Sequence, residues 1–291
     1  MLKTALVHLT GSSCDLPVLR ASLALVSDVK GHIDCLHLMP DPAELIAESA
    51  QTDSGGWIIL SDTIAEIQRE ANDRSRNAQA TVAAFAREND IRKQDDPPVG
   101  EQVTISWHEA VGDEFDHISK AGLYQDVIVV AGGRDRDGRL ATGALGGIVI
   151  HGGRPVLLAP ETASANPYRK ILVAWKETAE AARAVTAAMP LLERAGSVEF
   201  VHAGEPANRP GESADLSERV RSFMRWHDVN AEFNFIMPPA CTDAILQRAK
   251  ETGADLLVMG GYGHSRIREL VFGGFTQRVL AGVDLPVLMF H

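Results

Sequence analysis

A glycine-flanked segment near the C-terminus, 260–276, has the residue types of a phosphate-binding loop. Its four glycines at the flanks are Gly260, Gly263, Gly273 and Gly274. Because glycine has no Cβ, such a loop lets main-chain N–H groups approach a ligand closely. An apolar run, 255–259, precedes the segment and a helix-like pattern follows it, which is where the amides of a helix start favour an anion. The segment therefore predicts a site for the phosphate groups of a small ligand.

The glycine spacing excludes two common phosphate-binding motifs. No Gly-Lys-Ser/Thr follows the glycines, as a P-loop requires, and Gly261-Tyr-Gly263 lacks the third glycine of a dinucleotide fingerprint. The spacing of Gly, two residues, Gly, nine residues, Gly resembles the ATP-binding motif of the universal stress protein family. The resemblance implies ATP or another adenine nucleotide as the ligand, and it leaves open whether Mg²⁺ accompanies the nucleotide.

Two positions depart from the pattern of that family. The family usually has Ser or Thr after the last glycine, whereas here Gly274 follows and Thr276 supplies the next hydroxyl. The family also has an aspartate at the end of the first strand to hold adenine, and the matching positions are Thr10 and Lys176. Lysine has no acceptor for the adenine amino group. Glu177 is an alternative acceptor, and Lys176 is an alternative contact for a phosphate.

Length, charge and cysteine content bound the class of protein. The chain has 291 residues, 45% of them hydrophobic, and its 28 basic and 39 acidic residues give a net charge of -11. That balance argues against a broad surface for nucleic acid or for anionic membranes. No apolar run of about 18 residues suits a membrane span, and the three cysteines show no metal-binding spacing. We therefore expect a cytoplasmic protein without a disulfide framework.

An internal repeat organises the chain. Four pairs of matching segments occur in the same order, namely 5–10 and 171–176, 31–37 and 196–202, 126–130 and 255–259, and 154–158 and 285–289. Apolar strands alternate with helix-length segments, which predicts βαβ crossovers and an α/β fold. We expect two tandem doubly wound domains, each a parallel five-stranded sheet with helices on both faces. The resemblance implies the adenine nucleotide alpha hydrolase-like version of this fold.

The domain limits follow from a linker-like stretch. Residues 159–167 are small, polar and proline-containing, so we place one domain at 1–160 and the other at 168–291. A helical pattern at 63–90 is an insertion in the first domain. In the second domain, Thr242 suits the N-cap of a helix and Gly253 its C′ position.

The resemblance also implies a pairing mode for the two halves. Terminal strands of single-domain members commonly associate across a dimer, so the strands around Val156 and Val287 are expected to lie side by side. The chain is then an intramolecular pseudo-dimer whose edge strands protect each other. Whether two chains also form a homodimer stays open.

Only the second half is expected to bind the ligand. In the first half, 131–134 replaces the first two glycines of the segment, and Asp135 and Asp137 put carboxylates where phosphates would lie. Like charges there should repel a nucleotide. The predicted ligand-binding residues are Val173, Ala174, Lys176, Gly260, Gly263, His264, Gly273, Gly274 and Thr276. The alternative for the glycines is an ordinary tight turn between a strand and a helix.

The predicted function is that of a stress-response regulator. No catalytic constellation and no helical metal-binding spacing stands out, so any enzymatic activity is at most a weak ATPase. We expect bound ATP to stabilise one conformation and to alter the binding of unknown protein partners. The alternatives are a slow ATP hydrolase or adenylate-transfer enzyme, and a protein-interaction scaffold that binds no nucleotide.

Overall fold

The computed structural model of the chain describes residues 2–43, 57–96, 101–133, 140, 142–203, 212–236, 241–261, 274–280 and 282–291. The strands are β1 (Thr4–Leu9), β2 (His32–Met39), β3 (Arg92–Lys93), β4 (Thr104–Val111), β5 (Val127–Ala131), β6 (Val156–Ala159), β7 (Lys170–Trp175), β8 (Ser197–Ala203), β9 (Ala231–Ile236), β10 (Leu256–Gly260) and β11 (Val287–Phe290). The helices are α1 (Asp15–Val26), the 3-10 turn η1 (Ser27–Val29), α3 (Trp57–Glu88), α4 (Glu114–Gly122), α5 (Thr142–His151), α6 (Ala179–Leu192), α7 (Glu212–Arg225), α8 (Cys241–Thr252) and α9 (Gly274–Leu280).

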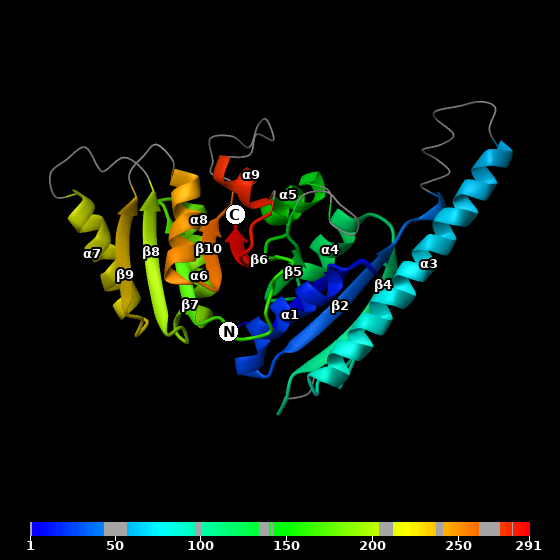
Figure 1. The fold of residues 1–291 in the computed structure, drawn as a ribbon, viewed down its shortest axis with the longest axis horizontal. Helices are drawn as coiled ribbons and strands as arrows, with labels where there is room; N and C mark the ends of the chain where they lie inside the picture. Colours follow the sequence, from blue (N-terminus) through cyan, green and yellow to red (C-terminus); the bar gives the residue numbers. More distant parts are fainter. Residues whose placement is uncertain are drawn as a thin grey trace.

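The strands form one continuous sheet that joins the two halves. Their order is β3-β4-β2-β1-β5-β6-β11-β10-β7-β8-β9, and Figure 1 shows the two halves on either side of β6 and β11. Neighbouring strands within each half are parallel, whereas β11 runs antiparallel to β6 with Met289 opposite Val156. The predicted α/β fold and the predicted pairing of the two terminal strands are therefore confirmed. The predicted domain limits, 1–160 and 168–291, stay a prediction.

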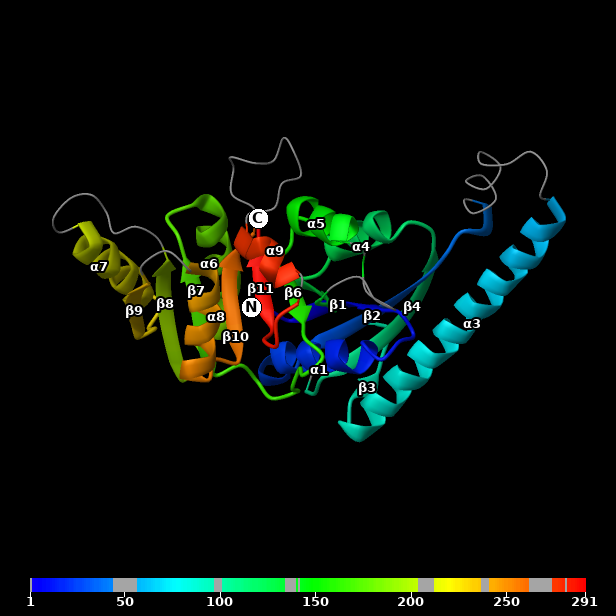
Figure 2. The same ribbon diagram turned by 45° about the horizontal axis from the view of Figure 1, so that its top comes forward.

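Helices cover both faces of the sheet, and this explains the apolar strands. The side chains of α1, α3, α6 and α7 share one buried cluster, and those of α4, α5, α8 and α9 share the other. Figure 2 shows α1 on one side of the first-half strands and α4 and α5 on the other. A central strand such as β5 or β10 has no solvent face, so its residues are apolar without alternation.

The long helix α3 lies against the first half at its C-terminal end. Its buried residues Ala78, Val82 and Phe85 follow the helical period and pack towards β2 and α1. In Figure 1 the N-terminal turns of α3 project beyond the sheet. After α3 the chain forms β3, a two-residue strand parallel to β4, which the sequence did not predict.

The two ends of α8 test the predicted caps. The helix α8 begins at Cys241, so Thr242 lies inside its first turn and the predicted N-cap was wrong by two residues. Gly253 has a φ of +65°, and the following N–H of Ala254 donates to the Ala249 carbonyl, so the predicted C′ glycine is confirmed. At the start of α6, the Thr178 side chain accepts a hydrogen bond from the Ala181 N–H.

Candidate functional site

The second half has its topological switch point between β7 and β10. The chain leaves β7 towards β8 and β9 on one side, and it returns to β10 and β11 on the other. Ala174 pairs with Met259, so Gly260, the last residue of β10, and Lys176, the residue after β7, lie at the same edge of the sheet. Ligands of open α/β sheets bind in the crevice outside such a point. The structure therefore brings the start of the glycine-flanked segment beside the loop that carries Lys176.

Gly260 ends β10 under the first turn of α6. A Cβ built on Gly260 would lie 2.6 Å from the Ala181 nitrogen and 2.8 Å from the Glu180 carbonyl carbon. Only glycine allows this approach, so the close packing of α6 is itself a structural reason for the residue. Gly261 continues along the same edge, and its N–H donates to the Phe290 carbonyl at 2.8 Å.

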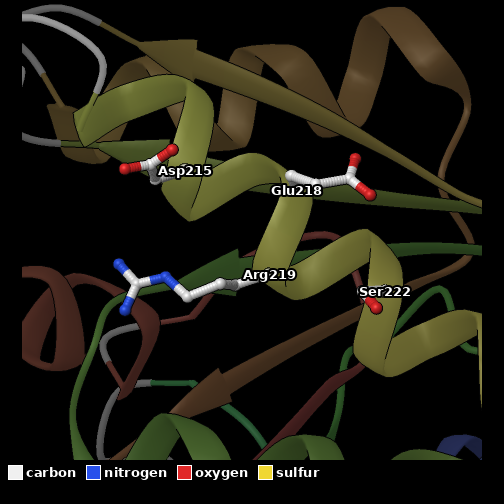
Figure 3. Close-up of a pocket in the computed structure, with 4 residues that line it drawn as sticks. All are labelled: Asp215, Glu218, Arg219 and Ser222. Atoms are coloured by element: carbon white, nitrogen blue, oxygen red, sulfur yellow. The ribbon is translucent and has the colours of Figure 1, made fainter.

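An ion pair joins the loop after β7 to α7. Glu177 Oε1 lies 3.3 Å from Arg219 Nη2, and both side chains are exposed. Arg219 also lines a cavity of about 590 Å³ together with Asp215, Glu218 and Ser222. Figure 3 shows the Asp215 and Arg219 side chains extending to the same side of α7, while Glu218 extends to the other. Arg219 therefore brings a second cation close to the Lys176 loop.

Sequence reasoning did not single out Arg219. Its position on α7 gives no motif, because the partner Glu177 is far away in the sequence and only the packing of α7 brings the two together. The pairing also fixes the role of Glu177 in this structure. Its carboxylate faces a guanidinium on α7.

His202 lies at the end of β8, between Trp175 and Phe235 on the neighbouring strands. Its ring centroid is 5.8 Å from that of Phe235, in an edge-to-face arrangement. Burial lowers the pKa of His202, and the nearby Glu177 carboxylate only partly opposes that effect. The imidazole is consequently neutral at neutral pH, and this edge of the sheet presents an uncharged aromatic group beside the charged loop.

The predicted residues occupy different depths around the switch point. Val173 is 1% exposed and belongs to the core below the edge, whereas Ala174 is half-buried and Lys176 is exposed. Gly274 begins α9, and Thr276 is buried in its first turn. Gly263, His264 and Gly273 lie outside the described residues. The geometry thus brings Ala174, Lys176 and Gly260 to one edge, and the roles of all nine residues stay predictions.

The equivalent loop of the first half, between β1 and α1, makes its hydrogen bonds to a side chain of its own half. The Asp15 carboxylate accepts hydrogen bonds from the N–H groups of Thr10 and Gly11, both at 2.9 Å. Burial raises the pKa of Asp15, although these hydrogen bonds oppose the shift. The α3 main chain at Arg74 lies directly against Gly11. The amides of this loop and Gly11 are therefore engaged by the chain itself. Asp135 and Asp137 lie outside the described residues.

The described edge carries charges of both signs, since the acidic side chain of Glu180 is buried beside Gly260. Lys176 and Arg219 supply positive charge, and the only carboxylate adjoining Lys176 in the chain, Glu177, is paired with Arg219. Across the described parts of the chain, no group of three or more His, Cys, Asp or Glu side chains could hold a metal ion. No described helix is long and apolar enough to cross a membrane. Cys14 and Cys35 are buried free thiols.

Comparison with protein families identifies the C-terminal segment. Residues 241–291 match the family model described as the Universal stress protein family. Over 49 residues the chain is 47% identical to Universal stress protein Slr1230 of Synechocystis sp. (strain ATCC 27184 / PCC 6803 / Kazusa). That alignment spans 17% of this chain and 17% of the relative. The resemblance to this family is confirmed, and the sequence evidence for it lies in the segment that carries the glycines and the last strand.

Comparison with solved structures extends over the whole chain. A universal stress protein from Archaeoglobus fulgidus DSM 4304 has a TM-score of 0.66 at 16% identity, covering 100% of this chain and 98% of that one. A putative universal stress protein from Pseudomonas aeruginosa UCBPP-PA14 has a TM-score of 0.59 at 14% identity, covering 99% and 93%. At such low identity the comparisons show a common fold.

Proposed function

We propose that this chain, whose C-terminal segment matches the universal stress protein family, is a nucleotide-binding stress-response protein with a single site in its second half. The observation that carries the proposal is the meeting of Lys176 and Gly260 at the switch point between β7 and β10. This is the position at which open α/β sheets bind ligands. A cytoplasmic location belongs to the same proposal.

The ligand in this proposal is ATP or another adenine nucleotide. The glycine-flanked segment 260–276 would supply main-chain donors to the phosphates, and Lys176 would add positive charge. The base would lie above Ala174, close to the neutral ring of His202. Mg²⁺ would be carried by the phosphates, because the described edge offers no cluster of carboxylates to hold the ion by itself.

The first half would contribute support rather than a second site. Its β1–α1 loop already satisfies the main-chain N–H groups of Thr10 and Gly11 through Asp15. The Arg74 main chain also covers Gly11. One nucleotide for each chain is therefore the expected stoichiometry.

The proposed mode of action is a change of conformation rather than catalysis. Ligand binding can shift a protein between two states only if the ligand binds them with different affinity. The segment between β10 and α9 would contact the ligand, and α9 packs directly on α8. Ligand binding would in this way alter the α8–α9 face that protein partners meet.

The experiment measures nucleotide binding and its stoichiometry. Mass spectrometry of ligand released from freshly purified protein and titration calorimetry with ATP are expected to give about one nucleotide per chain. Gly263→Asp should abolish binding, because it places a carboxylate in the predicted phosphate site. The matched control is Gly143→Asp, at a helical position where a Cβ would have nothing within 4 Å.

Two outcomes would contradict the proposal. Unchanged binding by Gly263→Asp would remove the second-half site, and two nucleotides per chain would contradict the closed first half. If the wild-type protein binds no nucleotide at all, the scaffold alternative replaces the proposal. Release of ADP or AMP during the titration would favour the hydrolase or adenylate-transfer alternative.

A further inference from the structure

The N-terminal part of α3 extends beyond the sheet and carries an apolar stripe. Figures 1 and 2 show these turns pointing away from the first half, whereas the helix meets the loop after β1 at Arg74. Ile64, Ile67 and Ala71 are partly buried, and the residues between them are exposed. Residues three and four apart lie on one face of a helix. We call these three residues the α3 stripe.

The α3 stripe continues the face by which the helix packs on the first half. Further along α3, that face buries Ala78, Val82 and Phe85 and meets α1 and β2. A helix in water gains most of its stability from burying such a face. We therefore expect another surface to cover the α3 stripe as well.

The charges of the projecting part disfavour a lipid surface as that cover. Between residues 57 and 73 the sequence has one basic residue, Arg69, and the four acidic residues Asp62, Glu66, Glu70 and Asp73. Helices that lie on anionic membranes instead carry Lys and Arg on their polar face. The projecting part of α3 thus suits a protein surface better than a membrane.

The spacing within the α3 stripe is that of a coiled-coil seam. In a heptad, Ile64 and Ala71 occupy the a positions and Ile67 the d position between them. The exposed charges of Glu66 and Arg69 then fall at positions c and f, outside the seam. The surface that fits this pattern is a second helix with the same repeat.

Two copies of α3 complement each other about the midpoint of the projecting part. The helix begins at Trp57 and reaches the first half at Arg74, so this midpoint lies between residues 65 and 66. When two copies run antiparallel about that point, Ile64 of each copy lies opposite Ile67 of the other. The start of each helix then lies beside Arg74 of the second copy. Each projecting part is in this way covered along its whole length.

The residues that flank this central layer also agree with self-pairing. Ala71 of one copy lies opposite position 60 of the other, which is leucine in the sequence, so a small residue meets a large one. Glu70 lies near position 63 of the second copy, which is threonine, and like charges do not face each other. Glu70 also pairs with Arg74 of its own helix at 2.7 Å, and this pair stays outside the seam.

We propose that α3 is a dimerisation helix, through which two copies of this chain pair antiparallel with Ile64 and Ile67 at the centre. The contact uses the same surface on both copies, so it closes at two chains. It is separate from the junction of β6 and β11, which each chain makes by itself. Each copy contributes only about five helical turns. The dimer is therefore reversible, and it dissociates at concentrations of a few micromolar.

The test is sedimentation of the full chain over a range of concentrations. The mass should rise from that of the 31.4 kDa chain towards twice this value. The rise is expected between about 1 µM and about 1 mM, as suits an interface at the small end of the specific range. Ile67→Asp should stay monomeric throughout, because it places two carboxylates at the centre of the seam. The matched control is Ala65→Asp, at an exposed position outside the seam, which should dimerise as the wild type does.

Spin labels report the direction of the two helices. The labels are attached to Gln68→Cys or to Glu88→Cys, both at exposed positions of α3, with Cys241 replaced by serine. Cys14 and Cys35 are buried. In the antiparallel pair, labels at position 68 lie within about 25 Å of each other and labels at position 88 about 70 Å apart. A parallel pair would give short distances at both positions.

Four results would overturn the proposal. They are a wild type that stays monomeric over the whole range, a dimer that persists in Ile67→Asp, a dimer that is lost equally in Ala65→Asp, and short label distances at both positions. A monomeric wild type would mean that another part of the chain or a different protein covers the α3 stripe. Circular dichroism checks that the variants are folded, and the concentration series of the wild type decides the question if Ile67→Asp is not.

Discussion

Gly11 lies directly against the main chain of Arg74, so close that a Cβ on Gly11 would be 2.2 Å from the Arg74 carbonyl oxygen. Gly11 also has a φ of +75°, in the left-handed region that side chains other than glycine rarely adopt. The loop after β1 and the middle of α3 are therefore packed together through a glycine. This contact places the middle of α3 beside the carboxyl end of β1, next to the core packing of Ala78 and Val82.

Gly11→Ala is expected to destabilise the protein by about 2–4 kcal/mol, because the new methyl group meets main-chain atoms and the backbone is strained. Urea unfolding measures the loss. Gly143→Ala is the control, since a Cβ there has open space and replacing glycine inside a helix adds up to about 1 kcal/mol of stability. Equal stability of the two variants would show that α3 can move away from Gly11 without cost.

Arg219→Gln should separate a role in binding from a role in stability. Its ion pair with Glu177 is exposed on both sides, so the free energy of unfolding should change by less than about 1 kcal/mol. If the proposed nucleotide site is correct, loss of this cation should weaken ATP binding several-fold at low salt and less at high salt. Calorimetry at two salt concentrations measures both effects.

The matched control for that variant is Arg225→Gln, which removes a second exposed ion pair from the same helix, the one with Glu218. It should leave ATP affinity unchanged. If both variants weaken ATP binding equally, the effect comes from the net charge of α7 and not from the contact with Glu177.

Separating the halves should expose their shared edge. Residues 1–160 end with β6 and residues 168–291 end with β11, and these strands are fully covered in the intact chain. An uncovered apolar edge invites pairing, so each fragment should self-associate when alone and form a one-to-one complex when mixed. Size-exclusion chromatography with light scattering measures this. Two fragments that stay monomeric after mixing would show that the β6–β11 contact contributes little.

Lowering the pH should destabilise the protein through His8. Burial lowers the pKa of His8 to about 4, whereas the unfolded chain has the ordinary value of 6.5. The unfolded state therefore binds more protons between these values, and stability falls as the pH falls through that window. The loss is at most about 3 kcal/mol from this group, and it is complete below the folded pKa.

His8→Leu should flatten this pH dependence. Urea unfolding of both proteins at about pH 7.5 and about pH 5 measures the difference, with the wild type losing more stability than the variant. A residual slope in the variant is expected, because burial also lowers the pKa values of His32 and His202. Identical slopes would mean that His8 is not the group that titrates.

The repeat and the sheet could be predicted from the sequence because their signals are local. Apolar runs, glycine turns and a strict order of matching segments specify the strands, whereas the pairing of the strands around Val156 and Val287 was inferred from the family resemblance. The packing of α3 over Gly11 could not be predicted, because no sequence pattern in the β1–α1 loop indicates a contact with Arg74. The contact between Glu177 and Arg219 could not be predicted either, because the two residues are far apart in the sequence.

The site could be predicted only in outline. Its position at the sheet edge follows from the order of strands, which the repeat specifies. The depth of each residue depends on which face of β7 the side chain occupies, and Val173 consequently lies in the core while Ala174 is half-buried. The close approach of α6 to Gly260 could not be predicted either, because the presence of a glycine does not indicate which element packs against it.

The antiparallel junction of β6 and β11 gives this chain a property that two separate subunits lack. Two subunits joined at such an edge separate on dilution, and a mutation in one appears in the other as well. Covalent linkage makes the association independent of protein concentration. It also lets the two copies differ, as they do where Asp15 and the inserted helix α3 engage the loop after β1 in the first half.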